Sequence, residues 1–172
     1  CSDPTALVSA PKAPQRLPEF VPERNMAELL DRMPWPDGFT GLRDRLILEL
    51  LYGTGMRLAE LTGLGPASVD LRRGTLRVVG KRNKERILPL AAPLVDLLRS
   101  YLPEREALQP AAEAGLLIKP DGNPLPRRTV QSMVKHYLSA VTTQDKRSPH
   151  VLRHTFATHL LDHGADLNAV KE

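Results

Sequence analysis

A single change of hydrophobic period, partway along the chain, constrains the fold more than any other feature of the sequence. Two β-prone runs, Thr75–Val79 and Arg86–Leu90, flank a polar turn over residues 80–85, which is the pattern of a β-hairpin with a basic tip. On both sides of this hairpin the apolar residues recur at helical spacing. The pattern therefore predicts a mainly α fold with a small antiparallel β-sheet, of the α+β class.

The apolar spacing, together with prolines and glycines at helix ends, predicts six helices. Their expected ranges are 22–33, 42–52, 58–64, 93–102, 128–141 and 149–163. The second helix has one apolar stripe, so four of its charged residues are expected to face away from the core: Arg43, Asp44, Arg45 and Glu49. Residues 116–118 are expected to form a further short strand.

The two ends of the chain differ in composition from the part between them. Five prolines fall within residues 1–22, which favours extended backbone and predicts an interdomain linker or arm over residues 1–21. Residues 22–172 are long enough for one domain with a core. Asp166 has the place of a helix cap, but the helix expected after it has only residues 167–172. We therefore expect the domain to be truncated at its C-terminus.

Two compositional features bear on location. No apolar run approaches the roughly 18 residues of a membrane span, and residues 1–30 lack a signal pattern. The one cysteine, Cys1, cannot form an internal disulfide or a cysteine-ligated zinc site. These features exclude membrane and secreted classes and predict a cytoplasmic protein.

Positive charge is concentrated in two windows of the sequence. Residues 72–86 and 127–153 hold 13 of the 24 lysines and arginines but only two of the 20 acidic residues. If the two windows fold onto one face, that face suits a polyanion such as duplex DNA. The alternative is two ordinary solvated faces. The cations that we expect to contact DNA are Arg82, Lys84, Arg86, Arg127, Arg128, Lys135 and Arg147.

Nucleotide and metal chemistry find little support in the sequence. Neither Gly53-Thr54-Gly55 nor Gly80-Lys81 has the spacing of a phosphate-binding loop, and the basic windows hold too few carboxylates for a magnesium nuclease. His150/His154 and His159/His163 are each four residues apart, as in some zinc sites. Neither pair has a glutamate after its first histidine or an obvious third ligand. A histidine-liganded metal protein is therefore an alternative, and no metal or cofactor is predicted.

Four residues together suit chemistry on a phosphodiester. His150 and Arg153 share one helical face near a helix start, Arg57 follows a glycine-containing turn, and Lys81 lies at the hairpin tip. Two guanidinium forks can grip phosphate oxygens and stabilise the charge of a pentavalent transition state. An imidazole and an ammonium can move protons. The set is consistent with phosphoryl transfer without a metal.

Three segments resemble, in order, the signature segments of tyrosine recombinases, and the Xer-type and integrase-like members most of all. They are the runs that begin Thr54-Gly55-Met56-Arg57, Gly80-Lys81-Arg82-Asn83 and Ser148-Pro149-His150-Val151. The resemblance implies the tyrosine recombinase catalytic-domain fold over residues 22–172. It also implies site-specific DNA recombination, in which a tyrosine attacks DNA and forms a 3′-phosphotyrosine, with no metal or ATP.

Residue by residue, the resemblance makes Arg57 and Arg153 the phosphate clamp and His150 the residue that assists proton transfer at the nucleophile. Lys81 corresponds to the hairpin lysine that protonates the 5′ leaving oxygen. Glu60 corresponds to an acidic residue that supports the site without contacting the phosphate. The implied partners are double-stranded DNA and further recombinase subunits in a tetrameric synapse.

The sequence departs from the family pattern at its end, where the family's later histidine and nucleophilic tyrosine are missing. Tyr52, Tyr101 and Tyr137 lie in helical patterns that favour packing roles. We therefore expect the chain to bind DNA without cleaving it and to be monomeric. The alternative is a non-catalytic DNA-binding or regulatory member of the same family.

Overall fold

The computed structural model describes residues 19–165, so residues 1–18 of the predicted arm over 1–21, and the helix expected over 167–172, lie outside the described residues. Within this part, no helix is both long enough and apolar enough to cross a membrane. The helices are α1 (Glu23–Ala27), followed directly by a π-helical turn (Glu28–Arg32), α2 (Phe39–Thr54), α3 (Leu58–Thr62), α4 (Ala92–Ala107), α5 (Arg127–Val141) and α6 (Pro149–Asp162).

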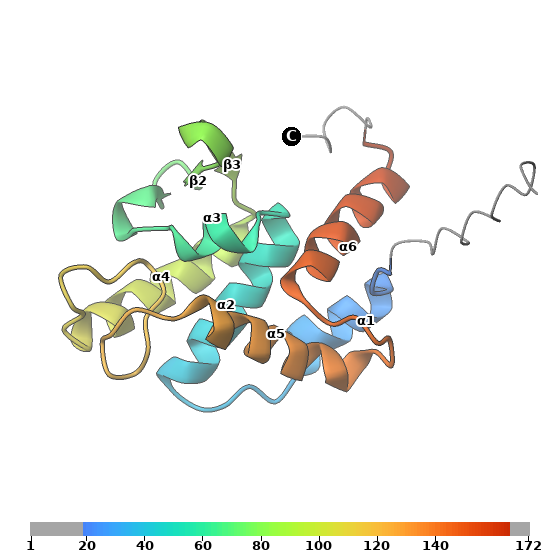
Figure 1. Cartoon of the computed structure of the whole chain (residues 1–172), viewed down its shortest axis with the longest axis horizontal. Coiled ribbons are helices and arrows are strands. Elements are labelled where there is room, and N and C mark those ends of the chain that lie inside the picture. The colour runs from blue at the N-terminus through green and yellow to red at the C-terminus, as the bar shows by residue number, and fades with distance from the viewer. Residues whose placement is uncertain (1–18, 166–172) are drawn as a thin grey trace, which may run out of the picture.

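The second helix, α2, forms the centre of the molecule. Helices α4 and α6 pack along it on different sides, and α5 crosses nearby (Figure 1). Leu46, Ile47, Leu48, Leu50 and Leu51 are all fully buried, so α2 is covered around most of its circumference instead of along one stripe. Burial of this kind stabilises a helix through tertiary contacts more than through its own propensity.

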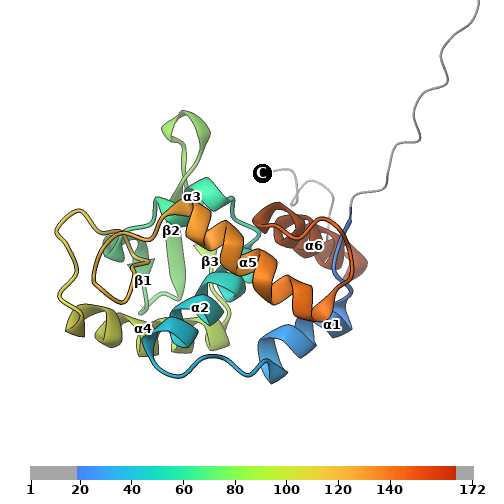
Figure 2. The ribbon, with the colours of Figure 1, turned by 60° about the horizontal axis from the view of Figure 1, so that its bottom comes forward.

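The predicted hairpin is present, and with a third strand it makes a small antiparallel sheet. Strands β1 (Val69–Asp70), β2 (Thr75–Val79) and β3 (Glu85–Pro89) pair in the order β1-β2-β3. The loop between β2 and β3 projects away from the helices (Figure 2). The mainly α fold with a small antiparallel sheet is therefore confirmed. The strand expected over residues 116–118 is wrong, because only a single bridge joins Ile118 to Pro124.

A second prediction is wrong for Arg43 and Asp44, which do not face away from the core but are 7% and 6% exposed. The Arg43 guanidinium donates to Asp44 Oδ1 at 2.7 Å and to the Ile118 carbonyl at 3.3 Å, and Tyr137 donates its hydroxyl to Asp44 Oδ2 at 3.2 Å. These groups are tolerated inside the protein because they are paired with one another. The network joins α2, α5 and the long loop between α4 and α5.

Residues 19–21, which we assigned to the linker, contact the domain. Val21 is fully buried, and its backbone N–H donates to the Thr155 hydroxyl of α6 at 3.0 Å. Gln144, in the loop before α6, donates its side-chain amide to the Phe20 carbonyl at 2.8 Å. The N-terminal end of the described chain is thus attached to α6.

The buried network yields a stability prediction. Replacing Asp44 with alanine leaves the Arg43 guanidinium buried without its carboxylate, so Asp44→Ala should lower the free energy of unfolding by about 3 kcal/mol or more. Tyr137→Phe removes one hydrogen bond and should cost about 1 kcal/mol. Urea unfolding at neutral pH measures both values.

A matched control is Asp96→Ala, because Asp96 pairs with Arg99 at 3.0 Å on the exposed face of α4. An exposed pair of this kind contributes at most about 1 kcal/mol. If Asp44→Ala and Asp96→Ala lowered the free energy of unfolding equally, the buried pair would contribute no more to stability than the exposed one.

Candidate functional site

The left-handed turn at Gly55 brings α2, α3 and α6 together at one place. Gly55 ends α2 with φ of 62°, and a Cβ atom there would overlap the Phe156 ring of α6. Only glycine fits this combination of conformation and close approach. Arg153 donates a hydrogen bond to the Gly55 carbonyl, and Arg57 follows two residues after Gly55 as the N-cap residue of α3.

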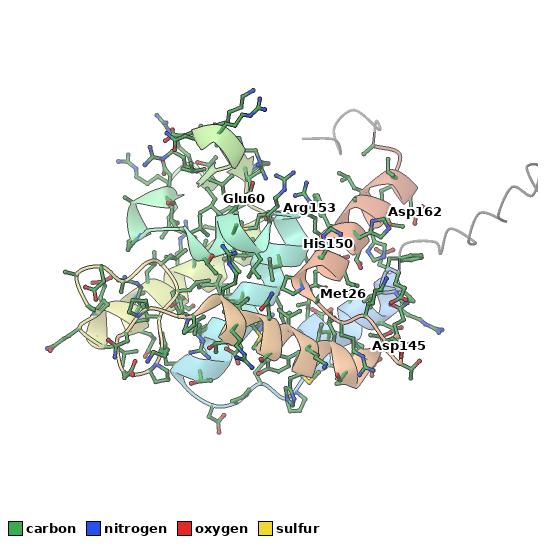
Figure 3. All side chains as sticks on the ribbon, in the orientation of Figure 1. Met26, Glu60, Asp145, His150, Arg153 and Asp162 are labelled. Carbon is green, nitrogen blue, oxygen red and sulfur yellow. The ribbon has the colours of Figure 1, made fainter. Side chains whose placement is uncertain are left out.

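Three of the four predicted catalytic residues line one open pocket of about 440 Å³. Arg57 comes from the start of α3, whereas His150 and Arg153 come from the first turns of α6. Figure 3 labels His150 and Arg153 on α6, and Glu60 between α6 and the hairpin in that view. The walls also include Met56, Gln131, Ser148 and Pro149. The prediction that Arg57, His150 and Arg153 converge on one place is consistent with this geometry.

The arginines of the pocket suit an anion, and so does the N-terminus of α6. This helix has 14 residues, begins at Pro149 after Ser148, and has no acidic residue in its first turn. Free backbone N–H groups and the helix dipole favour negative charge at such an end. His150 is exposed there, so its imidazole is accessible to a ligand.

A buried carboxylate, Glu60, lies beneath the arginines. Its side chain is 3% exposed, and its oxygens accept from the Arg57 backbone N–H at 2.7 Å and from Arg57 Nη1 at 3.2 Å. Arg86 on β3 donates two further bonds, at 2.8 Å to Oε1 and 3.0 Å to Oε2. Burial alone would raise the pKa of Glu60, but these bonds from Arg86 and Arg57 outweigh it and hold that pKa below its ordinary value.

Positive charge exceeds negative charge around this carboxylate. Burial and the neighbouring Arg57 guanidinium lower the pKa of Arg153, which places the two cations close together in a partly desolvated setting. Arg57 and Arg86 contact the Glu60 carboxylate, and Arg153 lies beside Arg57 in the same pocket, so three guanidiniums gather near one carboxylate. The arrangement keeps an unbalanced positive charge that a bound phosphate would neutralise.

Lys81 begins a 3₁₀ turn, Lys81–Asn83, at the hairpin tip, and its side chain lies outside the described part of the structure. The neighbouring residues Arg82 and Asn83 have φ of 62° and 60°. Gly80, just before Lys81, closes the loop by donating its N–H to the Lys84 carbonyl at 2.7 Å. The lysine is thus carried by a tight loop attached to the β2–β3 ladder.

The remaining predicted DNA contacts fall into two groups. Five are exposed at the surface, on the hairpin loop and on α5: Arg82, Lys84, Arg127, Arg128 and Lys135. Arg147 is half-buried and donates to the Gln144 carbonyl and the Ser139 hydroxyl. Arg86 is paired with Glu60, a contact that the sequence did not indicate.

The three tyrosines are engaged in internal contacts, one of them with a histidine. Tyr101 donates to the Leu116 carbonyl at 3.1 Å, and burial raises the pKa of Tyr101 to about 12. Burial and Asp44 raise the pKa of Tyr137 to about 12. The Tyr52 hydroxyl lies 3.0 Å from His159 Nδ1. Among residues 19–165 no group of three or more His, Cys, Asp or Glu side chains is placed to hold a metal ion.

The helices around α2, the small sheet and this pocket define a fold class, that of tyrosine recombinase catalytic domains. Two solved structures share it: a XerA recombinase, with a TM-score of 0.78 and 28% identity over 92% of this chain and 56% of that one, and a XerH recombinase bound to palindromic difH DNA, with a TM-score of 0.79 and 29% identity over 91% and 46%.

Sequence comparison then gives the family. The sequence model of the phage integrase family matches residues 19–172, and this chain belongs to that family as an Xer-like tyrosine recombinase. The tyrosine recombinase XerD of Yersinia pestis is 45% identical over 98% of this chain and 57% of its own length. The chain thus spans a little over half the length of such relatives.

Glu60 gives a pH-dependent prediction. Its pKa in the folded protein lies below the ordinary value of 4.5, so its ionised form stabilises the fold above that pH, and the stabilisation is lost as the pH falls through the folded pKa. Glu60→Gln should lower the free energy of unfolding by about 2 kcal/mol at neutral pH. The difference from the wild type should shrink near pH 3, as urea unfolding at both pH values can show.

Glu85→Gln is the control, because Glu85 is exposed and lies 3.6 Å from Arg77. Its effect should stay below about 1 kcal/mol at both pH values. A Glu60→Gln deficit that is equally large at pH 3 would contradict the assigned role of the carboxylate.

Proposed function

We propose that this chain is the part of a site-specific DNA recombinase that binds duplex DNA and holds the scissile phosphate. The pocket in which Arg57, His150 and Arg153 meet carries this proposal, because its donors and its excess positive charge match one phosphodiester. The family and the DNA-bound XerH relative support the choice of DNA over other polyanions.

The surface around the pocket supports a duplex as the ligand. Gln131 lines the pocket, and Arg127 and Arg128 lie one turn earlier at the start of the same helix, α5. Arg82 and Lys84 project with the hairpin loop on the other side of the α3 turn. Cations from both charged windows thus flank the pocket, as is needed to follow a phosphate backbone.

In the proposed reaction a tyrosine oxygen forms a bond to the scissile phosphorus, and the bond from phosphorus to the 5′ oxygen breaks. Arg57 and Arg153 stabilise the charge of the pentavalent transition state. His150 assists proton transfer at the attacking hydroxyl, and Lys81 gives a proton to the departing 5′ oxygen. Attack by a 5′ hydroxyl of another strand reverses the sequence and joins the new partner.

Tyr52, Tyr101 and Tyr137 are poor candidates for the nucleophile. Their hydroxyls already contact His159, the Leu116 carbonyl and Asp44 within the described structure. We therefore propose that the 172-residue chain binds DNA without forming a covalent link through these tyrosines. We also propose that it binds as a monomer. Strand exchange in a tetrameric synapse is proposed for a recombinase of the full length of the Xer relatives.

DNA binding by the 172-residue chain should weaken steeply as salt is raised, because neutralising about five or more phosphates releases their counterions. Fluorescence anisotropy with a labelled duplex across a salt series measures the slope. Arg128→Gln should lower that slope by about one. Arg99→Gln, on the exposed face of α4, should leave it unchanged. Binding that does not respond to salt would argue against the basic surface.

The clamp is tested by cleavage. The test uses this chain extended to the length of its Xer relatives. In that protein, Arg57→Lys and Arg153→Lys should each slow covalent attachment to a nicked duplex by about 100-fold, because an ammonium cannot form a bidentate fork. Denaturing gels of the protein–DNA adduct give the rate. Near-normal rates for both variants would remove these arginines from the site. Adduct formation by the 172-residue chain would identify one of its three tyrosines as the nucleophile.

A further inference from the structure

Arg86 is engaged in an ion pair with Glu60, although its side chain is 26% exposed. It lies on β3, next to the hairpin loop, and both arms of its guanidinium bind the two oxygens of Glu60, at 2.8 and 3.0 Å. A bidentate pair of this kind fixes the relative orientation of the two groups as well as their distance. Two of the five guanidinium N–H groups of Arg86 are used in this pair, so its main described partner is Glu60, although its sequence context favoured DNA contact.

The partner of Arg86 is also the support of Arg57. Glu60 accepts from the backbone and the side chain of Arg57, at 2.7 and 3.2 Å. One buried carboxylate therefore joins strand β3 to the start of α3. The attachment lies at the base of the loop that carries Lys81, since a Cβ atom on Gly80 would lie 3.4 Å from Glu60 Oε1 and 3.5 Å from Arg86 Nη1.

We propose that Arg86 is a positioning residue, which fixes the hairpin loop to the Arg57 turn so that Lys81 reaches the leaving oxygen of the phosphate that Arg57 holds. This inference rests on the proposed function and assigns to Arg86 a role distinct from DNA contact. Loss of Arg86 leaves the β2–β3 ladder intact but releases the base of the loop from α3. A displacement of about 1 Å at a reacting group can cost roughly 100-fold in rate.

A substrate that needs no leaving-group protonation tests this role. In the chain extended to the length of its Xer relatives, Arg86→Gln should slow cleavage of ordinary DNA by about 10- to 100-fold. With sulfur in place of the bridging 5′ oxygen, the variant should approach the wild-type rate, as Lys81→Ala should. Arg57→Lys should stay slow on both substrates, because its defect lies in the clamp. In the double variant, Lys81→Ala should add little to the effect of Arg86→Gln.

DNA affinity separates positioning from phosphate contact. Because Arg86 is proposed not to contact phosphate, Arg86→Gln should leave the salt slope unchanged and lower the affinity only through the lost charge, whereas Lys84→Gln should lower the slope by about one. Arg99→Gln, which breaks an exposed arginine–carboxylate pair, is the control for cleavage and should have no effect. Circular dichroism verifies folding. If Arg86→Gln does not fold, Arg86→Lys retains charge and length without the bidentate geometry and takes its place.

The possible failures are distinguishable. An Arg86 variant that is equally slow on oxygen and sulfur substrates, or that cleaves both at the wild-type rate, overturns the positioning role while the proposed function stands. A fall in the salt slope would reassign Arg86 to DNA contact. Wild-type protein that forms no adduct with either substrate overturns the proposed function, and the positioning role with it.

Discussion

One buried carboxylate, that of Glu60, determines how the cations of the site are arranged. Arg57 and Arg86 both bind it, and Arg153 lies close enough for its pKa to be lowered by Arg57. Without a negative charge between them, these guanidiniums would repel one another in a partly desolvated place. With only one such charge, the cluster remains positive and keeps its attraction for an anion. Glu60 thus reduces the repulsion between the arginines, while the cluster keeps a net positive charge.

The helices serve this arrangement by holding α2 firmly. Its leucines are fully buried, and the Arg43–Asp44 pair connects it to the loop before α5 through Ile118. Because α4 and α6 pack on different sides of α2, the turn at its end has little freedom to move. Arg57 and Arg153 therefore come from elements that share one rigid neighbour, which is what pre-organised recognition of a small anion requires.

Much of this could be predicted from local sequence, and the exceptions have a common cause. The hairpin and the helix ends near Gly55 and Pro149 follow from the spacing of apolar residues and from the positions of glycine and proline. The grouping of Arg57, His150 and Arg153 was expected from motifs that resemble those of a known family. Burial of Arg43 and Asp44 and the pairing of Arg86 with Glu60 were not predicted, because each depends on a partner far along the chain. The sequence shows which residues carry positive charge, whereas only the fold shows whether a given cation is already paired with a carboxylate.

The Gly55 turn has a consequence for how sequences of this kind can diverge. Arg57 and Arg153 are related through main-chain atoms: Arg153 bonds to the Gly55 carbonyl, and Arg57 follows Gly55 by two residues. The relative placement of the two arginines therefore depends partly on backbone atoms of residues 55–57 and not on side chains alone. A side chain at residue 55 would meet the Phe156 ring, so replacing this glycine would disturb the contact between α2 and α6 on which the Arg153 bond depends.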